Sequence, residues 1–120
     1  MNDISAQLAA KLQALWESSQ SVILERAVIL RVSQQQLAVN PTDAEARRRG
    51  GEAAHKLAGV LGVFGLPQGS RLASQIESLL HGSESDGSEP LTAENLQTLA
   101  NLVESLDAVI TSKASQTPGA

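Results

Sequence analysis

Apolar residues recur at intervals of three, four or seven along most of the chain, which is the periodicity of an amphipathic helix. The pattern predicts four helices, at about residues 4–38, 43–64, 70–80 and 92–113. No segment shows the sustained alternation of apolar and polar residues that is typical of a strand. Amphipathic helices joined by short connections favour an all-α fold, namely an antiparallel up-and-down four-helix bundle with an N-terminal helical extension.

Local signals indicate where the later helices begin. Pro41 disfavours helix at the residue before it, and this separates the first helix from the second. Thr42 is followed three positions later by Glu45, a capping-box pattern that predicts the start of the second helix. Ser70 and Thr92 are the predicted N-caps of the third and fourth helices.

The 120 residues fit one domain with one core, and residues 1–115 are predicted to form it. Within it, residues 81–91 are predicted to be a linker loop rich in Ser, Gly and acidic residues. Residues 116–120 are expected to be a flexible tail. The polar run at 17–21 leaves open whether the first helical segment is one helix or two. Trp16 is expected in the core or at the end of the bundle.

The chain has no cysteine, which excludes disulfides, thiolate metal sites and a cysteine nucleophile. Its net charge of −4 disfavours a general nucleic-acid partner, because the basic cluster at 47–49 is too small to line a groove. No stretch approaches the ~20 consecutive apolar residues of a membrane span, and the N-terminus lacks the pattern of a signal peptide. We therefore expect a cytoplasmic protein with no nucleic-acid or membrane partner.

One histidine, His55, lies in a glycine-rich part of the second predicted helix. On a helical wheel it lies opposite the apolar face, so its side chain is expected to point to solvent. Its neighbours on this outer face are either very small or charged: Arg48, Gly51, Glu52, Ala58, Gly59 and Gly62. A glycine inside a helix costs about 1 kcal/mol relative to alanine, and the predicted core face needs none of these glycines. We interpret them as keeping the imidazole uncovered.

An uncovered imidazole on a convex surface suits a large partner better than a small ligand, which would need a pocket. Imidazole is mostly neutral at pH 7 and can act as a nucleophile that forms a covalent intermediate. An ordinary surface histidine is the alternative interpretation. The other histidine, His81, lies at a helix end, where it suits the helix dipole, and we assign it no chemistry. No metal-binding histidine motif and no phosphate-binding loop occur, so we expect no metal site and no kinase active site on this chain.

The run HKLAGVLGVFGL at 55–66, followed by RLASQIE at 71–77, resembles the histidine phosphotransfer (HPt) domain of bacterial multistep phosphorelays. That family has a histidine, an apolar residue two positions on, a glycine four on and a Leu/Phe-Gly pair nine and ten on. A later helix then carries a small, an apolar and an acidic or amide residue. The matching positions here are His55, Leu57, Gly59, Phe64 with Gly65, Ala73, and Ile76 with Glu77. The resemblance covers about residues 20–110.

The resemblance implies that His55 accepts a phosphoryl group from a receiver-domain aspartate or a kinase and passes it to the receiver of a response regulator. The implied partners are receiver domains of response regulators or of a hybrid histidine kinase. No cofactor is implied on this chain, because the Mg²⁺ of the reaction belongs to the receiver. By analogy with the family, Glu77 would hydrogen-bond the imidazole, with an ordinary surface carboxylate as the alternative. A monomeric or weakly associating module is expected.

One position departs from the family pattern, because many members carry lysine three residues after the histidine, where this chain has Ala58. Lys56 and Arg48 are the cations that could take over its role. The alternatives are a helical domain that binds receivers without phosphotransfer, which the missing lysine favours, and the phosphotransfer domain of a chemotaxis-type histidine kinase. The residues predicted to support the phosphoryl acceptor are Lys56, Ala58, Gly59, Gly62 and Glu77. Those predicted to contact the partner are Arg48, Gly51 and Glu52.

Overall fold

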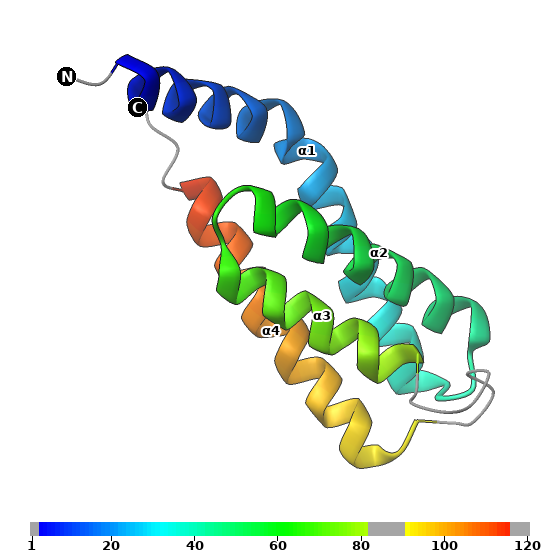
Figure 1. Ribbon diagram of the computed structural model, residues 1–120. Coiled ribbons are helices and arrows are strands. Elements are labelled where there is room, and N and C mark those ends of the chain that lie inside the picture. The colour runs from blue at the N-terminus through cyan, green and yellow to red at the C-terminus, as the bar shows by residue number, and fades with distance from the viewer. Residues whose placement is uncertain (1–2, 82–90, 116–120) are drawn as a thin grey trace.

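The computed structural model describes residues 3–81 and 91–115, which form helices and their connections (Figure 1). The helices are α1 (Asp3–Val39), α2 (Ala44–Val63), α3 (Pro67–His81) and α4 (Ala93–Ser115). No strand occurs in this part of the chain. The first segment, which could have been one helix or two, is a single helix of 37 residues. The expected tail at 116–120, and the expected linker loop apart from its residues 81 and 91, lie outside the described residues.

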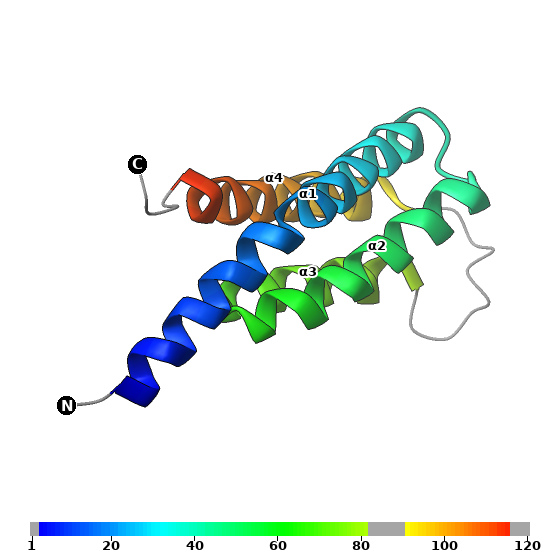
Figure 2. The ribbon, with the colours of Figure 1, turned by 90° about the horizontal axis from the view of Figure 1, so that it is seen from above.

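The four helices pack in a ring, in which each helix contacts the next along the chain and α4 returns to α1. Seen from above, α1 and α4 form one side of the bundle and α2 and α3 the other (Figure 2). Successive helices run in opposite directions, and the N-terminal half of α1 extends beyond the other three (Figure 1). These features confirm the predicted all-α, antiparallel up-and-down bundle with an N-terminal helical extension.

Aliphatic side chains fill the space between the helices, as the low aromatic content requires. Every helix presents buried residues at intervals of three or four, so that one face of each lies toward the common core. On α1 this face begins only at Trp16. The residues from 4 to 15 are exposed or half-buried, because this part of the helix passes beyond its neighbours.

Trp16 closes the core at the end of the bundle where α2 finishes. Its side chain is buried, and its ring meets the ring of Phe64 edge-on, with the centroids 5.3 Å apart. Lys113 Nζ, from the last turns of α4, lies 5.6 Å from the centre of the Trp16 ring, within the range of a cation–π contact. The expected place of Trp16, in the core or at the bundle end, is confirmed.

The N-cap of α2 is Asp43 and not the predicted Thr42. The Asp43 carboxylate accepts a hydrogen bond from the backbone nitrogen of Ala46 at 3.0 Å, which satisfies one of the unpaired amides of the first turn. Thr42 instead donates to Asn40 Oδ1 from both its backbone nitrogen and its hydroxyl, at 3.1 and 2.8 Å. Because Asp43 competes successfully for the cap, the helix begins one residue later than the capping-box pattern predicts.

The starts of α3 and α4 differ in how well the sequence predicted them. α3 begins at Pro67, three residues before the predicted cap Ser70, since proline suits a first turn, where its missing N–H is not needed. The Ser70 hydroxyl instead donates to the carbonyl of Ala58 at 2.8 Å and joins α3 to α2. Thr92 Oγ1 accepts from the backbone nitrogen of Asn95 at 3.0 Å, so the predicted cap of α4 is confirmed.

Glycines allow α2 and α3 to approach each other closely. A Cβ atom on Gly50 would lie 3.0 Å from Leu80 Cδ1, and one on Gly69 would lie 3.1 Å from Leu61 Cδ1. Both distances are shorter than ordinary side-chain contacts, so a larger residue at either position would require the facing leucine to shift. The spacing set by these glycines determines which residues of α3 can reach the outer face of α2.

Candidate functional site

His55 lies near the middle of α2, and its side chain is 73% exposed. Its Nδ1 lies 2.9 Å from Oε2 of Glu77, which is on α3 and whose side chain is 25% exposed. An ionised carboxylate can only accept a hydrogen bond, so Nδ1 carries the hydrogen and Nε2 carries the lone pair. Glu77 therefore fixes both the tautomer and the orientation of a ring that otherwise faces solvent. This is the contact that the family analogy suggests.

The surface over His55 is open. Among the described residues, Nε2 of His55 has no hydrogen-bond partner. One turn further on, a Cβ at Gly59 would have nothing within 4 Å. A helical side chain leans toward the N-terminus of its helix, so a large residue at position 59 would lie over the imidazole. Glycine at this position leaves Nε2 accessible to a partner of macromolecular size.

The other small residues of the predicted site lie toward α3. Gly62 is exposed, and a Cβ there would lie at an ordinary contact distance of 3.7 Å from Ser70 Oγ. Ala58 is half-buried against the core, and its carbonyl accepts the Ser70 hydroxyl. The position where the family often has lysine is therefore on the side of α2 that faces α3.

Gly51 does not belong to the exposed surface around His55, which corrects the sequence-based prediction. It is buried beneath the end of α3, where a Cβ would lie 3.9 Å from both Leu80 Cβ and His81 Nε2. Arg47 is buried beside it and donates a hydrogen bond to the carbonyl of Leu80. The prediction was wrong because a helical wheel assumes one covered face, whereas α1 and α3 cover two sides of α2. Gly51 is therefore a buried residue that packs against α3, and its role as a partner contact stays a prediction.

His81, for which we predicted no chemical role, lies beside the same carboxylate as His55. Its Nε2 is 3.7 Å from Oε2 of Glu77, one turn earlier on α3, and its side chain is 68% exposed. Glu77 therefore contacts two exposed histidines from two helices. The signal in the sequence was the spacing of four between Glu77 and His81, because residues four apart lie on the same helix face.

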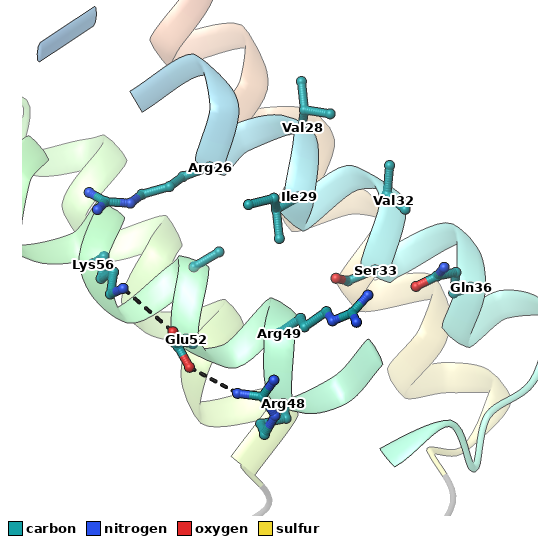
Figure 3. Close-up of a pocket in the computed structure, with 11 residues that line it drawn as sticks. Arg26, Val28, Ile29, Val32, Ser33, Gln36, Arg48, Arg49, Glu52 and Lys56 are labelled. Carbon is teal, nitrogen blue, oxygen red and sulfur yellow. Dashed lines mark hydrogen bonds and ion pairs between the residues drawn. The ribbon is translucent and has the colours of Figure 1, made fainter. Parts of the chain in front are cut away.

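A row of alternating charges runs along α2 next to His55. Arg48 Nη1 lies 3.1 Å from Glu52 Oε2, and Lys56 Nζ lies 3.4 Å from Glu52 Oε1 (Figure 3). Arg48 also binds Glu45, at 2.7 Å. The two cations that could meet a phosphoryl group or an acidic partner are thus each paired with a carboxylate of their own helix.

Glu45, at the start of this row, binds a second arginine, Arg49, at 3.1 Å. The hydrogen bond from Arg48, together with the charges of both arginines, outweighs desolvation and lowers the pKa of Glu45 from 4.5 to about 2. The same contact raises the pKa of Arg48. The first turn of α2 therefore keeps its charge pattern over the whole physiological pH range.

A groove between α1 and α2 lies next to the charged row. Its α1 wall combines the apolar residues Val28, Ile29 and Val32 with the polar residues Arg26, Ser33 and Gln36. Of the three apolar side chains, that of Ile29 lies toward α2 in Figure 3. Arg48 and Lys56 are among the residues that line it from α2. The exposed face of α2 is therefore bordered by this groove on the α1 side and by Glu77 on the α3 side.

Glu77 lies near both His55 and His81, at 2.9 and 3.7 Å. Over residues 3–81 and 91–115, no group of three or more His, Cys, Asp or Glu side chains is arranged to hold a metal ion. None of the helices described above is long and apolar enough to cross a membrane.

Comparison with known proteins identifies the family. The Hpt domain family matches residues 6–109, which is most of the chain, and the chain therefore belongs to this family. It is also 30% identical, over 118 residues, to Protein RcaC of Microchaete diplosiphon. That similarity covers 98% of this chain but 18% of the relative, so the chain spans less than a fifth of the length of the protein it matches. No solved structure matches the chain significantly.

The lowered pKa of Glu45 predicts a pH-dependent contribution to stability. Because the pKa is lower in the folded state, about 2 against 4.5, the contribution is present above pH 4.5 and is lost as the pH falls toward 2. We expect Glu45→Gln to lower the free energy of unfolding near neutral pH and to have little effect near pH 2. Urea unfolding followed by circular dichroism measures this difference.

The matched control is Glu94→Gln, since Glu94 also lies in the first turn of a helix but forms no ion pair within the described part of the chain. Its effect on stability should change less with pH. Equal loss of stability in Glu45→Gln at pH 7 and pH 2 would contradict the assignment.

Proposed function

We propose that this Hpt domain is a phosphorelay carrier, in which His55 accepts a phosphoryl group from a receiver-domain aspartate, or from a kinase, and passes it to the receiver of a response regulator. Family membership implies phosphotransfer in general. The observation that carries the proposal for this chain is the exposed ring of His55, whose Nδ1 is held by Glu77. The reaction is proposed to take place in the cytoplasm.

In the transfer step, the Nε2 lone pair of His55 attacks the phosphorus atom of the receiver's aspartyl phosphate. A nitrogen–phosphorus bond forms, the bond from phosphorus to the aspartate oxygen breaks, and its electron pair returns to the aspartate carboxylate. The imidazole keeps its proton on Nδ1 and becomes positively charged. Glu77 accepts that N–H and stabilises the charge as it develops. Transfer onward reverses these steps with a second receiver aspartate as the attacking group.

The surface next to His55 supports docking of a receiver domain. The groove between α1 and α2 offers three apolar residues of α1, Val28, Ile29 and Val32, and the charged row Arg48, Glu52 and Lys56 forms its border on the His55 side. An apolar centre with a charged rim is the usual composition of a protein interface. A receiver that covers the groove would bring its phosphorylated aspartate to the adjacent face of α2.

The missing family lysine at Ala58 leaves Lys56 as the lysine nearest to the acceptor. Its ammonium group is paired with Glu52 at 3.4 Å, and both side chains are about half-exposed. Exposed pairs of this kind contribute little free energy, so Lys56 can exchange the carboxylate for a phosphoryl oxygen at low cost. The Mg²⁺ of the receiver would supply most of the remaining charge stabilisation.

The proposal is tested by incubating the chain with a receiver domain that carries a radioactive aspartyl phosphate. We expect the label to move to the chain and to be labile in acid and stable in base, as a phosphohistidine is. His55→Gln should abolish the label. The matched control is His81→Gln, which removes the other exposed histidine that contacts Glu77 and should still accept the label.

The alternatives give different results in the same assay. Receivers that bind the chain without labelling it, although the fold is intact, would favour a non-catalytic interaction domain. Labelling only through a kinase domain and ATP would favour the phosphotransfer domain of a chemotaxis-type kinase. Labelling that survives in His55→Gln would show that the acceptor is wrongly assigned.

The open space at Gly59 predicts a separate effect on transfer. Gly59→Leu should leave the fold intact, because no atom lies near the added Cβ, yet its side chain would lean over His55. We expect the rate of phosphotransfer to fall by at least about tenfold, since misplacement of the reacting groups by even ~1 Å is costly. Gly59→Ala is the control of intermediate size and should transfer nearly normally. Unchanged transfer in Gly59→Leu would refute the role of this glycine.

A further inference from the structure

Exposed apolar side chains are concentrated on one helix. Among the described residues, ten large apolar residues are exposed, and nine of them lie on α1, the exception being Val63 on α2. Single exposed apolar residues are common on protein surfaces, whereas a gathering of them marks an interaction surface. The outer face of α1 is therefore the part of this surface that most needs an explanation.

Part of this face has the spacing of a helix–helix contact. Leu8, Leu15, Val22 and Ile29 recur at every seventh position, and each is between 36% and 57% exposed. Five further residues on the same side of the helix complete a stripe of nine, in which neighbouring members are alternately four and three positions apart. All nine residues are exposed. Such a seam is the pattern by which one long helix packs along another. We call these residues the α1 stripe: Ile4, Leu8, Lys11, Leu15, Ser18, Val22, Glu25, Ile29 and Val32.

The N-terminal residues of the α1 stripe belong to the part of the helix that projects from the bundle. All residues from 4 to 11 are exposed, and Figure 2 shows the N-terminal turns of α1 extending beyond the other helices. A helical segment of this length without tertiary contacts is only marginally stable in water. A second helix packed along the stripe would bury the apolar residues and stabilise the projecting turns.

The charges of the α1 stripe indicate that this second helix is another copy of α1. Lys11 and Glu25 are its only charged residues, and they lie seven positions before and after Ser18. Neither forms an ion pair or hydrogen bond within the described part of the chain. Two copies packed antiparallel about a two-fold axis near Ser18 would bring each Lys11 within about one turn of the other copy's Glu25. A parallel pair would instead place like charges together.

The remaining members of the α1 stripe agree with this arrangement. The same axis brings the apolar end at Ile4 of one copy toward Val32 of the other, so apolar residues meet at both ends. Ser18, at the axis, is small, and its hydroxyl donates to the carbonyl of Leu15 at 3.1 Å, so it needs no partner in the second copy. The stripe satisfies the condition for an isologous contact, in which one patch is complementary to itself.

We propose that the α1 stripe is the interface of an antiparallel homodimer. From residue 4 to residue 32 the contact would extend over about 42 Å of helix, or about four heptads, which is long enough for a stable helix pair. The proposal does not depend on phosphotransfer. Ile29 and Val32 also line the groove between α1 and α2, so the dimer and a receiver docked in that groove would exclude each other.

The first test is the mass of the chain in solution, measured by sedimentation equilibrium over a range of concentrations. We expect the mass to rise toward twice 12.6 kDa as the concentration increases. Leu15→Glu should keep the chain monomeric without loss of helix content, because Leu15 is exposed. The matched control is Val63→Glu, which places the same charge on an exposed valine outside the α1 stripe and should leave the dimer intact.

Charge reversal tests the identity of the partner and the direction of packing. Lys11→Glu or Glu25→Lys alone would place like charges at two symmetric sites and should weaken dimerisation about tenfold. The double variant Lys11→Glu/Glu25→Lys restores both pairs only in an antiparallel homodimer, and its dissociation constant should return to within about twofold of the wild-type value.

Three results would overturn the proposal. The first is a wild-type chain that stays monomeric at its highest soluble concentration. The second is a dimer that persists in Leu15→Glu, and the third is a dimer weakened by both single reversals and not restored by the double variant.

Discussion

The close packing of α2 on α3 is the constraint on which the candidate site depends. Gly50 and Gly69 lie where the two helices pack closely, and a Cβ at either position would crowd a leucine of the other helix at 3.0 or 3.1 Å. At this spacing Glu77 of α3 reaches Nδ1 of His55 at 2.9 Å. Without that contact an exposed imidazole would adopt several rotamers and expose either nitrogen. The orientation of the proposed nucleophile thus depends on the distance between two helices.

The features that depend on a single helix could be predicted from the sequence, and those that depend on how helices cross could not. Periodicity alone predicted four helices and the exposure of His55, while the family pattern suggested its contact with Glu77. The burial of Gly51 and Arg47 was not foreseen, because it results from α3 covering a second side of α2. The position of His81 beside Glu77 follows from their spacing of four on α3, a signal that was present in the sequence.

α1 differs from the other helices in the number of surfaces it provides. One face enters the core from Trp16 onward, another lines the groove beside α2, and the exposed α1 stripe runs along the helix and reaches that groove at its C-terminal end. Because Ile29 and Val32 belong to both the groove and the stripe, association of two copies would hide part of the surface proposed for receiver docking. The concentration of free carrier would then depend on the same helix that completes the bundle.

The central claim is that Glu77 holds Nδ1 of His55 and leaves Nε2 as the atom that receives the phosphoryl group. The most direct test is to phosphorylate the chain with phosphoramidate or a phosphorylated receiver and to record ³¹P and ¹H–¹⁵N NMR spectra of the imidazole. The account predicts that the phosphoryl group is on Nε2 and that the proton remains on Nδ1. A phosphoryl group on Nδ1 would contradict it, because Glu77 could not then accept a hydrogen bond from that nitrogen.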